Sequence, residues 1–108
     1  MKISLFPLQT ILFPGGPLSL RVFERRYLDM VSSCMASDQL FGIILNKPSS
    51  TNDINNFSKI GTLAQIVDWD QGSDGVLGLK VIGKERFILT SHYTDENGLN
   101  MGEIEILE

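Results

Sequence analysis

The residue types best suited to chemistry are few, and the first of them are two closely spaced carboxylates. Asp68 and Asp70 flank Trp69, and on a strand both would point to one face, where paired carboxylates hold a metal or share a proton. His92, the single histidine, is distant in sequence and lies in the turn-like segment TSHYTDENG. The pattern therefore favours solvated acidic residues at a strand end and a surface histidine.

A second candidate is the segment GLKVIGK, which has the glycine and lysine spacing of a phosphate-binding loop. Glu85 occupies the position where that motif needs a serine or threonine, and its charge would repel phosphate. A strand with a bulge at Gly83 explains the segment better. Cys34, the single cysteine, excludes an intramolecular disulfide and a cysteine-based zinc site.

No combination of nucleophile, base and orienting group is present. We therefore predict no catalytic, metal-binding or cofactor-binding residues.

The length of 108 residues fits one domain over residues 1–108. The net charge of −4 opposes a nucleic-acid partner, because binding to nucleic acid depends on neutralising phosphates. No apolar run approaches the about 20 residues of a membrane span. A single cysteine and a proline-interrupted N-terminus predict a cytoplasmic protein with no membrane partner.

The chain alternates between short apolar runs and turn signals. The sequence PGGP must form a tight corner, because proline fixes φ and glycine permits positive φ. QGSD and DENG predict two further turns, and the polar segment 46–58 predicts a mobile surface loop. Strands are predicted at 2–8, 10–13, 18–23, 40–45, 60–70, 75–89 and 99–108.

One helix is predicted from Glu24 onward, where the apolar period changes to that of a helix. Its apolar stripe consists of Tyr27, Met30, Val31, Cys34 and Met35. The predicted fold class is therefore mainly β with one or two helices, arranged as a small closed or half-closed β-barrel with a helix across one end. The chain stops on a strand-like pattern, which predicts truncation.

The stretch LFPLQTILFPGGPLSLRVFERRYLDMV resembles the N-terminal, substrate-binding domain of the Lon protease family, in which FPL, LFPG and FE-x-RY recur in this order. FGIIL, IGTLAQIVD and DGVLGLKVIGKERFIL also agree with that family. The resemblance implies a PUA-like β-barrel, followed in relatives by a helical portion that this chain lacks. Full-length Lon adds an ATPase module and a serine–lysine protease module, which are absent here.

The resemblance implies a non-catalytic module that recognises unfolded or tagged protein segments. Two alternatives stay open: an RNA-binding PUA-like domain, and a small-molecule-binding adaptor domain like those that serve ubiquitin ligases. Homo-oligomerisation is also left open. The predicted peptide-binding residues are Leu18 at a strand start, Arg25 and Arg26 at the helix start, and Trp69 at a hairpin.

Overall fold

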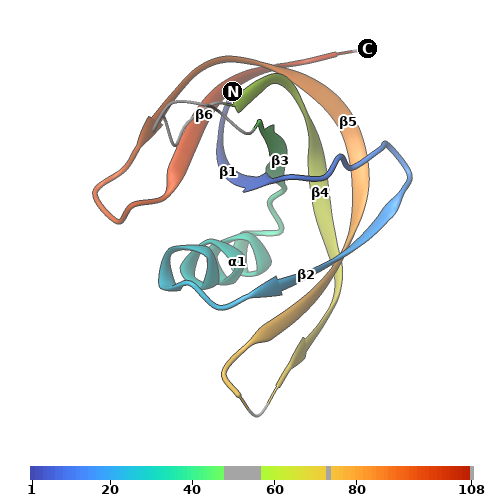
Figure 1. Ribbon diagram of the computed structural model, residues 1–108, viewed down its shortest axis with the longest axis vertical. Coiled ribbons are helices and arrows are strands. Elements are labelled where there is room, and N and C mark those ends of the chain that lie inside the picture. Colours follow the sequence, from blue (N-terminus) through green and yellow to red (C-terminus); the bar gives the residue numbers. More distant parts are fainter. Residues whose placement is uncertain (48–56, 73, 108) are drawn as a thin grey trace.

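The computed structural model describes residues 1–47, 57–72 and 74–107, which form six strands and one helix (Figure 1). The elements in chain order are β1 (Lys2–Leu8), β2 (Pro17–Val22), α1 (Arg25–Ser37), β3 (Phe41–Asn46), β4 (Phe57–Gln71), β5 (Leu77–Thr94) and β6 (Asn100–Ile106). The predicted β-rich barrel with one helix is confirmed, but the helix packs against the outer face of the sheet rather than across one end of the barrel. No helix within the described ranges is both long and apolar enough to cross a membrane.

Five of the strands close into a ring. Their order is β1–β3–β4–β5–β6, and β6 pairs with β1 to complete the circle. Only β1 and β3 run parallel, and every other pair is antiparallel. β1 closes the ring through its two halves, because Lys2–Ser4 pair with β6 and Leu5–Leu8 pair with β3.

The long strand β5 belongs to two parts of the molecule at once. Its second half pairs with β6 in the ring, while its first half pairs with β2 along the same edge. The second half of β4 continues alongside β5 beyond its last pairing with β3, at Ala64. These three segments (17–22, 65–71 and 77–82) extend from the barrel as a three-stranded sheet, here called the arm (Figure 1).

The protein has two apolar cores because strand side chains alternate between two faces. The first core fills the barrel and consists of Ile3, Leu5, Ile44, Leu63, Phe87 and Ile104. The second lies between the outer face of the sheet and α1, which packs into the angle between barrel and arm. It consists of Phe6, Leu12, Leu20, Val22, Tyr27, Met30, Val31, Cys34, Phe41, Ile43, Ala64, Leu79 and Val81.

The PGGP corner is held against β5 by its backbone. Gly15 donates a hydrogen bond to the carbonyl of Gly83 (2.8 Å), and Gly83 donates to the carbonyl of Gly16 (2.9 Å). A Cβ atom at Gly83 would overlap the carbonyl group of Phe13, so only glycine lets the two segments approach this closely. The register of β4 against β5 shifts between Thr62 and Ala64, opposite Gly83, as the predicted bulge requires.

Three local predictions need correction or fall outside the described residues. Residues 10–13 form no strand, because the segment crosses the outer face of β4, where the hydroxyl of Thr62 donates to the carbonyl of Leu12 (2.7 Å). Met35 lies at the edge of the helical stripe and is 38% exposed. The predicted surface loop at 46–58 falls mostly on residues 48–56, outside the described ranges, and β4 already begins at Phe57.

Candidate functional site

Two adjacent arginines at the start of α1 have different surroundings. Arg25, the first helical residue, is exposed and lies 4.0 Å from Asp29, which is also exposed, one turn further along the helix. Arg26 turns toward the loop between β5 and β6. Its guanidinium donates to the carbonyl of Gly98 (2.8 Å), lies 3.5 Å from Glu24, and covers the ring of Tyr27 at 4.8 Å.

The turn between β5 and β6 is shaped to receive Arg26. One carboxylate oxygen of Asp95 accepts hydrogen bonds from the backbone of Asn97 and of Leu99, both at 2.9 Å. Gly98 has a positive φ of 82°, which completes the turn. The predicted DENG turn is therefore confirmed, and it fixes the carbonyl that holds Arg26.

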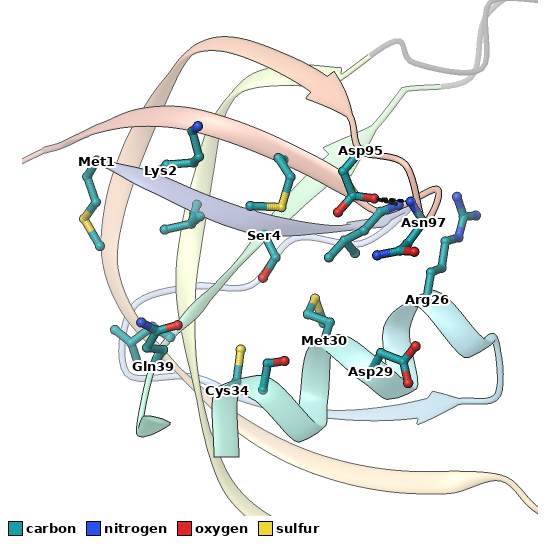
Figure 2. A pocket seen from close by; sticks show the side chains of 15 residues that line it. Met1, Lys2, Ser4, Arg26, Asp29, Met30, Cys34, Gln39, Asp95 and Asn97 are labelled. Atoms are coloured by element: carbon teal, nitrogen blue, oxygen red, sulfur yellow. Dashed lines mark hydrogen bonds between the residues drawn. The ribbon is translucent and has the colours of Figure 1, made fainter. Parts of the chain in front are cut away.

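A groove of about 520 Å³ lies beside Arg26, between α1 and the first residues of β1 (Figure 2). We call it the helix groove. Figure 2 shows Ser4 pointing from the sheet toward the helix, while Met30 and Cys34 point from the helix toward the sheet. Its lining residues are Met1, Lys2, Ile3, Ser4, Arg26, Asp29, Met30, Ser33, Cys34, Gln39, Leu40, Asp95, Asn97, Leu99 and Met101.

Sulfur-containing side chains are concentrated in the helix groove. Three of the four methionines, Met1, Met30 and Met101, line it together with Cys34. Met1 is 64% exposed and Met101 is partly exposed. Met30 lies deep in the groove and is only 3% exposed. Methionine is flexible and polarisable, so a surface built from it adapts to apolar side chains of differing shape.

A second groove, of about 500 Å³, lies on the other side of Arg26. We call it the aromatic groove because four aromatic residues contribute to it. One of them, Phe23, connects β2 to α1 and is 69% exposed. The lining residues are Phe6, Pro7, Arg21, Val22, Phe23, Glu24, Arg26, Tyr27, Asn46, Phe57, Thr94, Gly98 and Asn100.

Comparison with known proteins gives the family of this fold. Residues 2–108 match the family described as the ATP-dependent protease La (LON) substrate-binding domain. The chain belongs to this family. The 108 residues thus hold the Lon substrate-binding domain and do not include the ATPase and protease modules of a full-length Lon protease.

Solved structures support the same assignment. The Lon N-terminal domain protein from Xanthomonas campestris is 39% identical and superposes with a TM-score of 0.86, covering all of this chain and 60% of that one. The N-terminal domain of the Mycobacterium avium complex Lon protease shares the fold, with a TM-score of 0.76 at 13% identity, over 55% of that chain. Protein cereblon from Danio rerio is 24% identical over 100 residues, which are 90% of this chain and 23% of that protein.

In this Lon substrate-binding domain, two of the predicted site residues lie on the arm rather than at either groove. Leu18 pairs with Val81 on β5 and is half-buried against the second core. It lies four residues before Val22, or about 13 Å along the strand. Trp69 is 57% exposed on β4, two strands away from β2. The structure thus brings Arg26 to the grooves but does not bring Leu18 or Trp69 there.

The residues singled out for chemistry lie apart on the Lon domain surface. Asp68 and Asp70 are exposed on β4, and a carboxylate oxygen of Asp68 accepts from the backbone N–H of Trp69 (2.9 Å). No group of three or more potential metal ligands occurs within the described ranges. His92 is exposed on β5 with its ring 5.0 Å from that of Phe57. GLKVIGK lies within β5, as the bulged-strand prediction requires.

Two buried groups beside the grooves have shifted pKa values. Burial raises the pKa of the Cys34 thiol, and a hydrogen bond with the Ser4 hydroxyl partly opposes that shift. Burial also raises the pKa of the Tyr27 phenol, opposed by the charge of Arg26 and by the side chain of Asn100. Both groups are therefore neutral at physiological pH, and a thiol with a raised pKa is a weak nucleophile.

Residue patterns alone did not point to the methionines or to Phe23 as groove residues. Met1 precedes β1, Met30 lies on α1 and Met101 lies on β6. The pairing of β6 with β1 brings Met101 close to the start of the chain, and the packing of α1 adds Met30. Phe23 belongs to the FE-x-RY motif, where its apolar character predicts a strand end. In the structure, Phe23 lies in the connection between the end of β2 and the start of α1, outside both elements.

Proposed function

We propose that this domain binds exposed, unfolded segments of other proteins and that it does so without catalysis. Its membership of the Lon substrate-binding family supports a protein ligand. Among its surfaces, the helix groove fits such ligands best, because its methionines adapt to many apolar side chains. This adaptable lining is the observation on which the proposal rests.

The charged groups around the helix groove suit a polypeptide with mixed side chains. Arg26 and Lys2 are cationic, Asp29 and Asp95 are anionic, and all four line the groove. A rim of both signs does not select strongly for one charge, while the apolar floor favours segments that a folded protein would bury. We expect weak binding, with a Kd of about 1–100 μM, since each captured segment loses conformational entropy.

The arm residues Leu18 and Trp69 form a second contact region in this proposal. An extended chain covers about 3.3 Å per residue, and the whole molecule extends 36 Å in its longest direction. A client segment of about ten residues is therefore long enough to reach from a groove to the arm. Arg25, which is exposed beside the groove, adds a cation to this path.

The experiment compares two methionines on the same protein. Met101→Gln places a polar side chain of similar length in the helix groove, whereas Met35→Gln makes the same change on α1 outside it. Binding of reduced and carboxymethylated lysozyme is measured by fluorescence anisotropy. We expect Met101→Gln to raise the Kd about five-fold or more and Met35→Gln to change it less than two-fold.

The same assay distinguishes the alternatives. Equal affinities of the two variants, with equal thermal stability, would contradict the helix groove as the binding site. Tight, steeply salt-dependent binding of a single-stranded RNA in place of the unfolded protein would instead support an RNA-binding domain. The net charge of −4 argues against that outcome.

A further inference from the structure

A third groove, of about 260 Å³, lies on the outer face of β3 and β4, beneath the segment that leads into the PGGP corner. We call it the corner groove. It shares no lining residue with the helix groove or the aromatic groove. The residues that line it are Thr10, Ile11, Leu12, Phe13, Ile43, Leu45, Ser58, Ile60, Gly61, Thr62 and Arg86.

Contacts of the segment around Leu12 with β4 leave large apolar side chains exposed to solvent at this groove. The buried hydrogen bond from Thr62 to the carbonyl of Leu12 anchors the segment on β4, and Leu12 itself is buried. Its two neighbours therefore face outward: Ile11 is 56% exposed and Phe13 is 59% exposed. Ile60 adds a third apolar side chain, 47% exposed. Clustered exposure of this kind marks an interaction surface more often than isolated exposure does.

Arg86 supplies the only charge among the lining residues. Its guanidinium lies over the Phe13 ring, 5.7 Å from the ring centre. Within residues 1–47, 57–72 and 74–107, no carboxylate lies within ion-pair distance of it. The groove thus presents a cation, positioned on an aromatic face, that lacks an anionic partner among these residues.

The size of the groove limits what it can hold. Small-molecule sites usually enclose about 300–1,000 Å³ and carry several convergent polar groups. The corner groove is smaller, and its Thr62 hydroxyl is already engaged by Leu12. The volume suits one or two bulky side chains, and the single guanidinium suits one carboxylate.

We propose that the corner groove binds an extended segment of another protein in which a bulky apolar side chain is followed by an aspartate or glutamate. The apolar side chain packs between Ile11, Phe13 and Ile60, and the carboxylate pairs with Arg86. This surface lies apart from the helix groove, so it gives the domain a second, more selective contact. Selectivity follows from the charge, since neither a basic nor an uncharged segment satisfies Arg86.

Fluorescein-labelled decapeptides test this inference. One carries Phe-Glu at its centre in a Gly/Ser background, and two matched peptides carry Phe-Gln or Ser-Glu instead. We expect the Phe-Glu peptide to bind about three- to ten-fold more tightly than either, and to lose that preference with Arg86→Gln. Ile60→Thr should weaken binding of the peptide by a similar factor, because it keeps a β-branched side chain but removes apolar surface.

The matched controls lie outside the corner groove. Arg21→Gln removes another exposed arginine, on β2, and Val67→Thr changes another exposed apolar strand residue, 52% exposed on β4. Both should leave the peptide Kd within two-fold of the parent value. Backbone NMR shift changes on adding the peptide should centre on Phe13 and Ile60.

Two outcomes would overturn the inference. In the first, the three peptides bind the parent protein with equal Kd values, or the Kd of the Phe-Glu peptide is the same for the parent protein and for both variants, Arg86→Gln and Ile60→Thr. In the second, the protein forms a dimer that Ile60→Thr abolishes, which would make a second copy of the chain the occupant. Neither outcome bears on the Met101→Gln test with unfolded lysozyme, so failure of this inference is distinguishable from failure of the proposed function.

Discussion

The neighbouring residues Arg25 and Arg26 have different structural roles in this domain. Arg25 forms an exposed ion pair within α1, a contact of about 0.5 kcal/mol or less. Arg26 joins α1 to the β5–β6 turn through the carbonyl of Gly98 and also covers Tyr27. Reversing both charges together would therefore disturb the fold as well as any binding, so Arg25→Gln is the cleaner probe of a surface cation.

The raised pKa values of Cys34 and Tyr27 predict a loss of stability at alkaline pH. As the pH rises, the unfolded chain releases protons from these groups before the folded chain does. The free energy of unfolding then decreases with pH, because the unfolded state binds fewer protons. We expect constant stability near neutrality and a decline that begins at about pH 8.5, measured by urea unfolding at pH 7, 8.5 and 10.

Single variants separate the two contributions. Cys34→Ala should remove the part of the decline that starts near the ordinary thiol pKa, and Tyr27→Phe the part that starts near the ordinary phenol pKa. The comparison uses the slope against pH, so a constant loss of stability in either variant does not obscure it. Slopes equal to that of the parent protein would show that neither group titrates differently on folding.

At the scale of elements, two glycines of β5 differ in the space that a side chain would have. Gly83→Ala would force a Cβ atom against the carbonyl group of Phe13, where two backbone hydrogen bonds hold the segments together. We expect it to lower the free energy of unfolding by about 1–3 kcal/mol, measured by urea denaturation.

Gly78→Ala is the matched control on the same strand. A Cβ atom there has its nearest neighbour, the carbonyl of Asp70, at 3.4 Å. Alanine at this position should change stability by about 0.5 kcal/mol or less. Similar effects of the two substitutions would show that the corner does not depend on the close approach at Gly83.

At the scale of the whole molecule, local patterns predicted most elements but not their closure. Alternating residues such as Ile104 and Glu105 identify a strand, and the period of Tyr27, Met30 and Cys34 identifies a helix. Both patterns are local. The pairing of β6 with β1 joins residues about 100 positions apart, and no local pattern specifies it. The helix groove depends on that pairing, so its methionines could not be located from sequence.

The arm shows the same limit for the predicted binding residues. The QGSD signal predicts a hairpin, and β4 and β5 pair on both sides of it, with Trp69 near its end. The sequence could not show that β2 would add to the far side of β5, which places β5 between Trp69 on β4 and the strand that leads into the helix. Proximity within a sheet depends on strand order, and strand order is a property of the complete fold.

The ring order has a consequence for how the protein is made. Among the strands of this domain, β1 leaves the ribosome first, yet one of its two partners, β6, leaves it last. Until Asn100–Ile106 has emerged, β1 keeps an unpaired edge, and the barrel core around Leu5 and Phe87 is open to solvent. We expect a chain ending at residue 99 to bind a hydrophobic dye and to sediment as aggregates, whereas the 108-residue chain does neither. A monomeric, cooperatively unfolding 1–99 fragment would mean that nascent chains fold before the ring closes.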